Sequence, residues 1–142
     1  MKLTNYIGSS IVGFIVLAGI GYGWHAVLFK HMYGMMGNLT FILSALGLTA
    51  VGMTHFIGRG FQANRWANDG ALQGGLFGLF ALGGGHVFLR GFVGSYSNQL
   101  LAMDLTWAVL GGVICGISIS YVFKSMSGAK KGKGHRSLRR VA

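Results

Sequence analysis

Residues 11–18 read Ile11-Val12-Gly13-Phe14-Ile15-Val16-Leu17-Ala18, a run with no polar side chain and no alternation of apolar with polar residues. The run lies inside a longer apolar segment that extends from about Tyr6 to Phe29. Backbone groups in lipid must be hydrogen-bonded internally, which leaves only helices or closed barrels. Barrel strands would alternate at every second residue. This segment is therefore predicted to be a membrane-spanning helix.

Three further apolar segments follow, so the predicted spans are residues 6–29, 39–57, 71–92 and 99–123. Each has about 19 to 25 residues, or about 28 to 37 Å as a helix, enough to cross a hydrocarbon core of about 30 Å. We therefore expect an all-α fold. Residues 1–123 form one domain, an integral membrane bundle of four transmembrane helices, and residues 124–142 form a basic tail.

The composition does not suit a soluble domain. Of the 142 residues, 52% are hydrophobic and 10% are charged, whereas roughly a quarter are charged in soluble domains. The net charge of +10 comes mainly from the tail, so it does not predict nucleic acid as a partner. The single cysteine, Cys115, lies in an apolar run and is expected to be a small buried side chain.

The distribution of cations predicts the orientation of the chain. Lys2, Arg59, Arg65 and seven tail cations fall on one side of the predicted bundle, whereas Lys30 and Arg90 fall on the other. Loops rich in Lys and Arg remain in the cytoplasm. We therefore predict that both termini are cytoplasmic.

Small residues recur at every fourth position along the third and fourth spans. Such stripes allow close backbone approach between helices in lipid. They comprise Gly70, Gly74 and Gly78 in the third span, and Ala108, Gly112, Gly116 and Ser120 in the fourth. The sequence leaves open whether these stripes meet within one chain or between subunits. Gly83-Gly84-Gly85 is either another close-packing site, which we favour, or a break in the third helix.

Four ionisable side chains are expected about 7 Å below the outer surface of the membrane. They are His25, His86, Arg90 and Asp104, with Trp24 and Trp107 as interfacial anchors at a similar depth. Ionisable groups inside a span are costly to bury and are functional candidates by default. The favoured interpretation is a polar clamp between helices. The alternative is a proton or ligand site with Asp104 as acceptor and His25 or His86 as its partner.

A second cluster follows the first span. It contains His31, Met32, Met35 and Met36 in the predicted outer loop. Imidazole and thioether ligands suit Cu(I), although methionines that dip into the interface explain the pattern more simply. No cofactor other than copper is suggested by the sequence.

The tail is expected to dock anionic lipid headgroups or an acidic partner protein through its cations. These are Lys124, Lys130, Lys131, Lys133, Arg136, Arg139 and Arg140.

Two short stretches resemble a family of small four-helix bacterial membrane proteins of unknown function. They are Gly21-Tyr22-Gly23-Trp24-His25-Ala26-Val27-Leu28-Phe29 and Met103-Asp104-Leu105-Thr106-Trp107-Ala108-Val109-Leu110-Gly111. The resemblance implies a bacterial protein of the inner membrane. The basic tail and His86 are not part of the family pattern.

No recognised catalytic motif is present, so we do not expect an enzyme. The favoured function is a non-catalytic accessory subunit of a larger membrane complex, with other membrane proteins as partners. One alternative is a small transporter or proton-linked channel that uses the outer Asp, His and Arg layer. The other is a copper-binding membrane protein with its site on the periplasmic side.

Overall fold

The computed structural model describes residues 3–30, 39–92 and 97–128, and for residues 89, 90, 92, 127 and 128 the backbone alone. Within these ranges all regular structure is helical. Four helical segments are long and apolar enough to cross a membrane: Leu3–Leu28, Leu39–Gly60, Trp66–Phe88 and Asn98–Met126. The predicted all-α class and the four candidate spans are confirmed.

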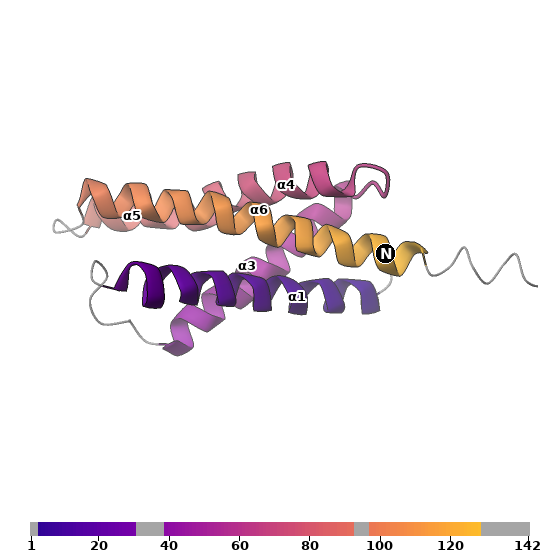
Figure 1. The fold of residues 1–142 in the computed structure, drawn as a ribbon, viewed down its shortest axis with the longest axis horizontal. Helices are drawn as coiled ribbons and strands as arrows, with labels where there is room; N and C mark the ends of the chain where they lie inside the picture. The colour runs from indigo at the N-terminus through magenta and orange to yellow at the C-terminus, as the bar shows by residue number, and fades with distance from the viewer. Residues whose placement is uncertain (1–2, 31–38, 93–96, 129–142) are drawn as a thin grey trace, which may run out of the picture.

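The four segments are built from seven helical elements (Figure 1). The first joins α1 (Leu3–Tyr22) to a π-helical turn, η1 (Gly23–Leu28), and the second is α3 (Leu39–Gly60). The third joins α4 (Trp66–Phe77), a second π-helical turn, η2 (Gly78–Gly83), and α5 (Gly84–Phe92), while the fourth is α6 (Asn98–Gly128).

All four helical segments are longer than the sequence predicted, the third and fourth by the most. The third span begins at Trp66 rather than near residue 71, with Asp69 in its first turn. A carboxylate there is favoured by the helix dipole, and the Nε atom of Arg65 lies 3.4 Å from its Oδ1 atom. The helix α6 continues past residue 123 to Gly128, so the first residues of the predicted tail are helical.

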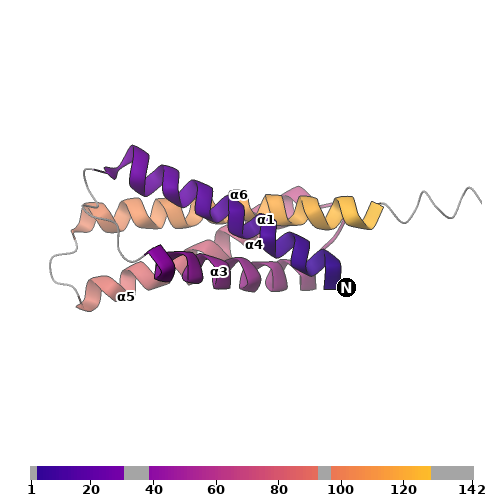
Figure 2. The same ribbon diagram turned by 90° about the horizontal axis from the view of Figure 1, so that it is seen from below.

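Different segments of the chain meet at the two ends of the bundle. Figures 1 and 2 show the start of α1, the α3–α4 connection and the end of α6 together at one end, here called the near end. The end of η1, the start of α3, α5 and the start of α6 lie at the opposite end, here called the far end. The helix α6 packs against both α4 and α1, and α3 packs mainly across α1.

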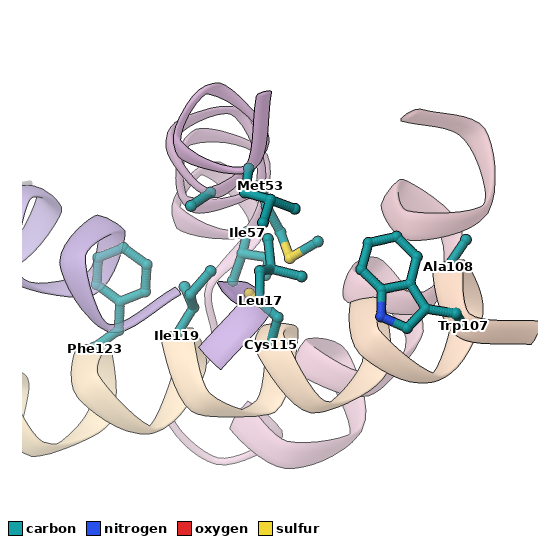
Figure 3. Close-up of a cluster of buried hydrophobic side chains, with 10 residues drawn as sticks. Leu17, Met53, Ile57, Trp107, Ala108, Cys115, Ile119 and Phe123 are labelled. Carbon is teal, nitrogen blue, oxygen red and sulfur yellow. The ribbon is translucent and has the colours of Figure 1, made fainter. Parts of the chain in front are cut away.

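The core of the bundle lies where α1, α3 and α6 meet. Leu17, Met53, Cys115 and Ile119 are fully buried there (Figure 3). The outward faces are also apolar, and the side chains of Ile7, Ile11 and Ile15 on α1 are about half exposed. An apolar exterior is what a lipid-facing helix requires, because hydrocarbon cannot solvate polar groups.

The helices α4 and α6 touch through their backbones along the two small-residue stripes, a contact called the α4–α6 seam below. A Cβ atom added to Gly74 would overlap the carbonyl oxygen of Gly112, and one added to Gly78 would overlap that of Ala108. A Cβ atom on Gly116 would likewise overlap the carbonyl oxygen of Gly70. The two stripes therefore face each other within one chain.

Candidate functional site

The carboxylate of Asp104 is the most deeply buried charged group among the described side chains. Asp104 lies near the start of α6, and its side chain is 1% exposed. The Nε2 atom of His25, on η1, lies 3.5 Å from Oδ1, and the Nδ1 atom of His86, on α5, lies 3.3 Å from Oδ2. One carboxylate thus connects three helical segments, and we call these three residues the His–Asp–His cluster.

The tautomer of His25 follows from its second contact. Its Nδ1 atom lies 2.9 Å from the carbonyl oxygen of Gly21, one turn earlier. A carbonyl oxygen can only accept, so Nδ1 carries the hydrogen of a neutral imidazole. A neutral His25 would then present the lone pair of Nε2 to the Asp104 carboxylate. A stable contact between Nε2 and Oδ1 therefore requires one more proton, on either the imidazole or the carboxyl group.

His86 does not need a further proton. A neutral imidazole with its hydrogen on Nδ1 is attracted to the carboxylate, and Nδ1 lies 3.3 Å from Oδ2 of Asp104. With one extra proton shared by His25 and Asp104, the cluster as a whole is electrically neutral. Neutrality is the least costly state for ionisable groups enclosed in a low-dielectric interior.

Both histidines lie within or just after a π-helical turn. His25 belongs to η1, and His86 follows η2 by a few residues. Such turns insert an extra residue into the helix and are frequent at functional sites. The chain remains helical through Gly83, Gly84 and Gly85, so there is no break at this point.

Trp107 contacts both imidazoles. It lies one turn after Asp104 on α6 and is 4% exposed. Its ring meets that of His25 edge-on at 5.3 Å between centroids, and that of His86 at 6.5 Å. Figure 3 shows Trp107 beside the buried core of the bundle. Trp107 therefore belongs to the buried core and is not an exposed interfacial anchor. The spacing of three residues from Asp104 would have predicted a shared helix face.

The two histidines are the more exposed members of the cluster. Their side chains are 23% and 25% exposed, whereas that of Asp104 is almost fully enclosed. The imidazoles therefore lie between the carboxylate and the surface of the bundle. Imidazole is well suited to relay protons because it can donate at one nitrogen and accept at the other.

Three of the four residues of the predicted polar layer thus meet in the structure. Arg90 lies on α5, and its side chain is outside the described part of the chain. The predicted copper ligands His31, Met32, Met35 and Met36 also lie outside the described residues, as do the tail cations Lys130, Lys131, Lys133, Arg136, Arg139 and Arg140. Within residues 3–30, 39–92 and 97–128, no group of three or more His, Cys, Asp or Glu is placed to hold a metal ion.

By the length and apolar character of its four spans, the chain is a membrane protein. It matches no protein-family model, no curated protein and no solved structure. The resemblance to a bacterial four-helix family therefore stays a prediction.

Proposed function

We propose that the protein is a small proton-linked transporter or channel in which the His–Asp–His cluster binds the proton. One observation carries this proposal. Because Nδ1 of His25 donates to the carbonyl oxygen of Gly21, its contact with Asp104 requires an additional proton. In this state either His25 is an imidazolium that donates to both oxygens, or Asp104 is a neutral carboxyl group that donates to Nε2.

Release of this proton changes the forces between helices. A deprotonated cluster carries a net negative charge inside the bundle, which is costly. Loss of the proton also leaves the lone pair on Nε2 of His25 facing the Oδ1 atom of Asp104, and these two acceptors repel each other. The contact between η1 and α6 therefore weakens when the proton leaves, and protonation becomes coupled to the arrangement of the two helices.

The proposed orientation places the near end in the cytoplasm of a bacterial cell and the cluster toward the outer face of the inner membrane. Arg59, Arg65 and Lys124 belong to the near end, whereas the described cation side chain of the far end is Lys30. This asymmetry supports the orientation with both termini inside.

Proton flux into liposomes tests the proposal. The wild-type protein, reconstituted with an entrapped pH-sensitive dye, is expected to conduct protons under an imposed gradient. Asp104→Asn keeps the shape of the side chain but removes its charge, and it should abolish this flux. The matched control is Asp69→Asn, which changes the only other carboxylate side chain and should leave the flux intact. Equal flux from wild type and Asp104→Asn, or no flux from wild type, would refute the proposal.

A second candidate, the accessory subunit of a larger complex, is favoured by the first two turns of α3. Every residue from Leu39 to Ala45 is exposed, and the side chain of Phe41 is 76% exposed. Ile42 and Leu43 are 37% and 38% exposed, so these turns are partly covered by the rest of the described chain, and their outer face leaves room for a partner helix. The copper-binding alternative rests on residues outside the described part of the chain.

The native mass of gently extracted protein separates the two candidates. For a transporter we expect a monomer or a small homo-oligomer, because the cluster is complete within one chain. A large assembly with other proteins in fixed stoichiometry would instead assign the exposed turns of α3 to a subunit interface.

A further inference from the structure

A second group of polar side chains lies at the near end, far along the bundle from the His–Asp–His cluster. It comprises three exposed cations: Arg59 in the last turn of α3, Arg65 just before α4, and Lys124 near the end of α6. Two aromatic residues lie at the same end: Trp66 contacts Lys124, and Tyr121 contacts Trp66. We call these five residues the basic–aromatic patch.

Trp66 holds the patch together. The Nζ atom of Lys124 lies 4.7 Å from the centre of the Trp66 ring. The same ring packs against Tyr121 on α6, with 5.6 Å between centroids. A cation over an indole face is attracted by the ring, which favours this position of Lys124. The start of α4 and the end of α6 are therefore joined beside a positive charge.

The patch has more positive charge than its neighbours neutralise. Asp69 is the nearby carboxylate, and it contacts Arg65 through the Nε atom of the guanidinium. The Arg65 side chain is still 62% exposed. A guanidinium has five N–H donors, so its terminal amino groups remain able to bind another anion. Arg59 and Lys124 have no carboxylate contact among the described residues.

The position of the patch along the bundle indicates which kind of anion it binds. One candidate span ends at Gly60, another begins at Trp66, and a third ends at Met126, so the patch lies where three apolar helices leave the hydrocarbon. Trp and Tyr prefer this level of a membrane. The phosphates of anionic lipids lie at the same level and attract nearby Lys and Arg. Arg is suited to phosphate because its planar fork binds two oxygens at once.

We propose that the basic–aromatic patch is a binding site for the headgroup phosphate of an anionic glycerophospholipid, held between Arg65 and Lys124 and flanked by Trp66. The site is independent of proton binding at the opposite end of the bundle. Its occupant fastens the α3–α4 connection to the end of α6.

Native mass spectrometry of the full chain in detergent micelles tests the site. Phosphatidylglycerol is titrated as the probe, and phosphatidylcholine, which has no net charge, serves as the reference lipid. We expect retention of phosphatidylglycerol in preference to phosphatidylcholine. Arg65→Gln and Lys124→Gln should each weaken phosphatidylglycerol binding about fivefold. Both positions are on the surface, so the variants should fold normally.

The control is Lys30→Gln, which removes one exposed cation from the far end and should leave phosphatidylglycerol binding unchanged. If Lys30→Gln weakens phosphatidylglycerol binding as much as Lys124→Gln does, the effect depends only on the net charge of the protein. That result would overturn the site. Inorganic phosphate should not displace the lipid. Full displacement by millimolar phosphate would overturn the lipid assignment and identify a small-anion site instead.

Discussion

Gly74→Ala is expected to destabilise the bundle by about 3 kcal/mol or more, although it adds only one methyl group. The new Cβ atom would overlap the carbonyl oxygen of Gly112 and lie 2.7 Å from the Cα atom of Gly116. These are backbone atoms, which cannot rotate aside as a side chain can. The α4–α6 seam must therefore open along its length, and the packing on both sides of Gly74 is lost with it.

Gly19→Ala is the matched control for this prediction. Gly19 lies within α1, and an added Cβ atom there would have no neighbour within 4 Å among the described residues. Alanine is a better helix former than glycine, so this variant should be equal to wild type or slightly more stable. Thermal unfolding in one detergent compares the three proteins. Equal melting temperatures for Gly74→Ala and Gly19→Ala would contradict the close backbone contact between α4 and α6.

The α4–α6 seam also shows how far the sequence could predict the fold. The four-residue spacing of Gly70, Gly74 and Gly78 marks one face of a helix, and this spacing is visible in the sequence alone. Which helix packs against that face depends on the tertiary structure. The stripe on α6 and a second copy of the chain would have satisfied the same spacing equally well.

The sequence predicted how far along their spans the three residues of the His–Asp–His cluster lie, but not the direction in which their side chains point. The distance of His25, His86 and Asp104 from the ends of their spans follows from counting residues along an apolar segment. The face on which each lies depends on the helical register. The π-helical turns η1 and η2 each change that register near a histidine. Projection onto a regular α-helix therefore could not establish that both imidazoles meet one carboxylate.

Replacing both histidines is expected to be far more damaging than replacing the whole cluster. In the double variant His25→Leu with His86→Leu, the Asp104 carboxylate loses both imidazoles, although the wild-type packing leaves it only 1% exposed. An Asp104 carboxylate left ionised without these partners costs about 3–5 kcal/mol, and this cost falls as the pH is lowered and the carboxylate takes up a proton. Adding Asp104→Asn removes the charge, and the triple variant should regain most of this stability. Thermal unfolding of the double and triple variants in the same micelles measures the recovery.

Proton flux in the triple variant then separates a proton site from a structural clamp. A clamp serves only to hold η1, α5 and α6 together, so neutral side chains that restore stability would also restore every activity of the protein. A proton site cannot be replaced in this way, because the leucine and asparagine side chains of the triple variant have no group that binds a proton near neutral pH. We therefore expect recovered stability without recovered flux. Flux that returns together with stability would assign the cluster to the clamp and the proton path to another part of the chain.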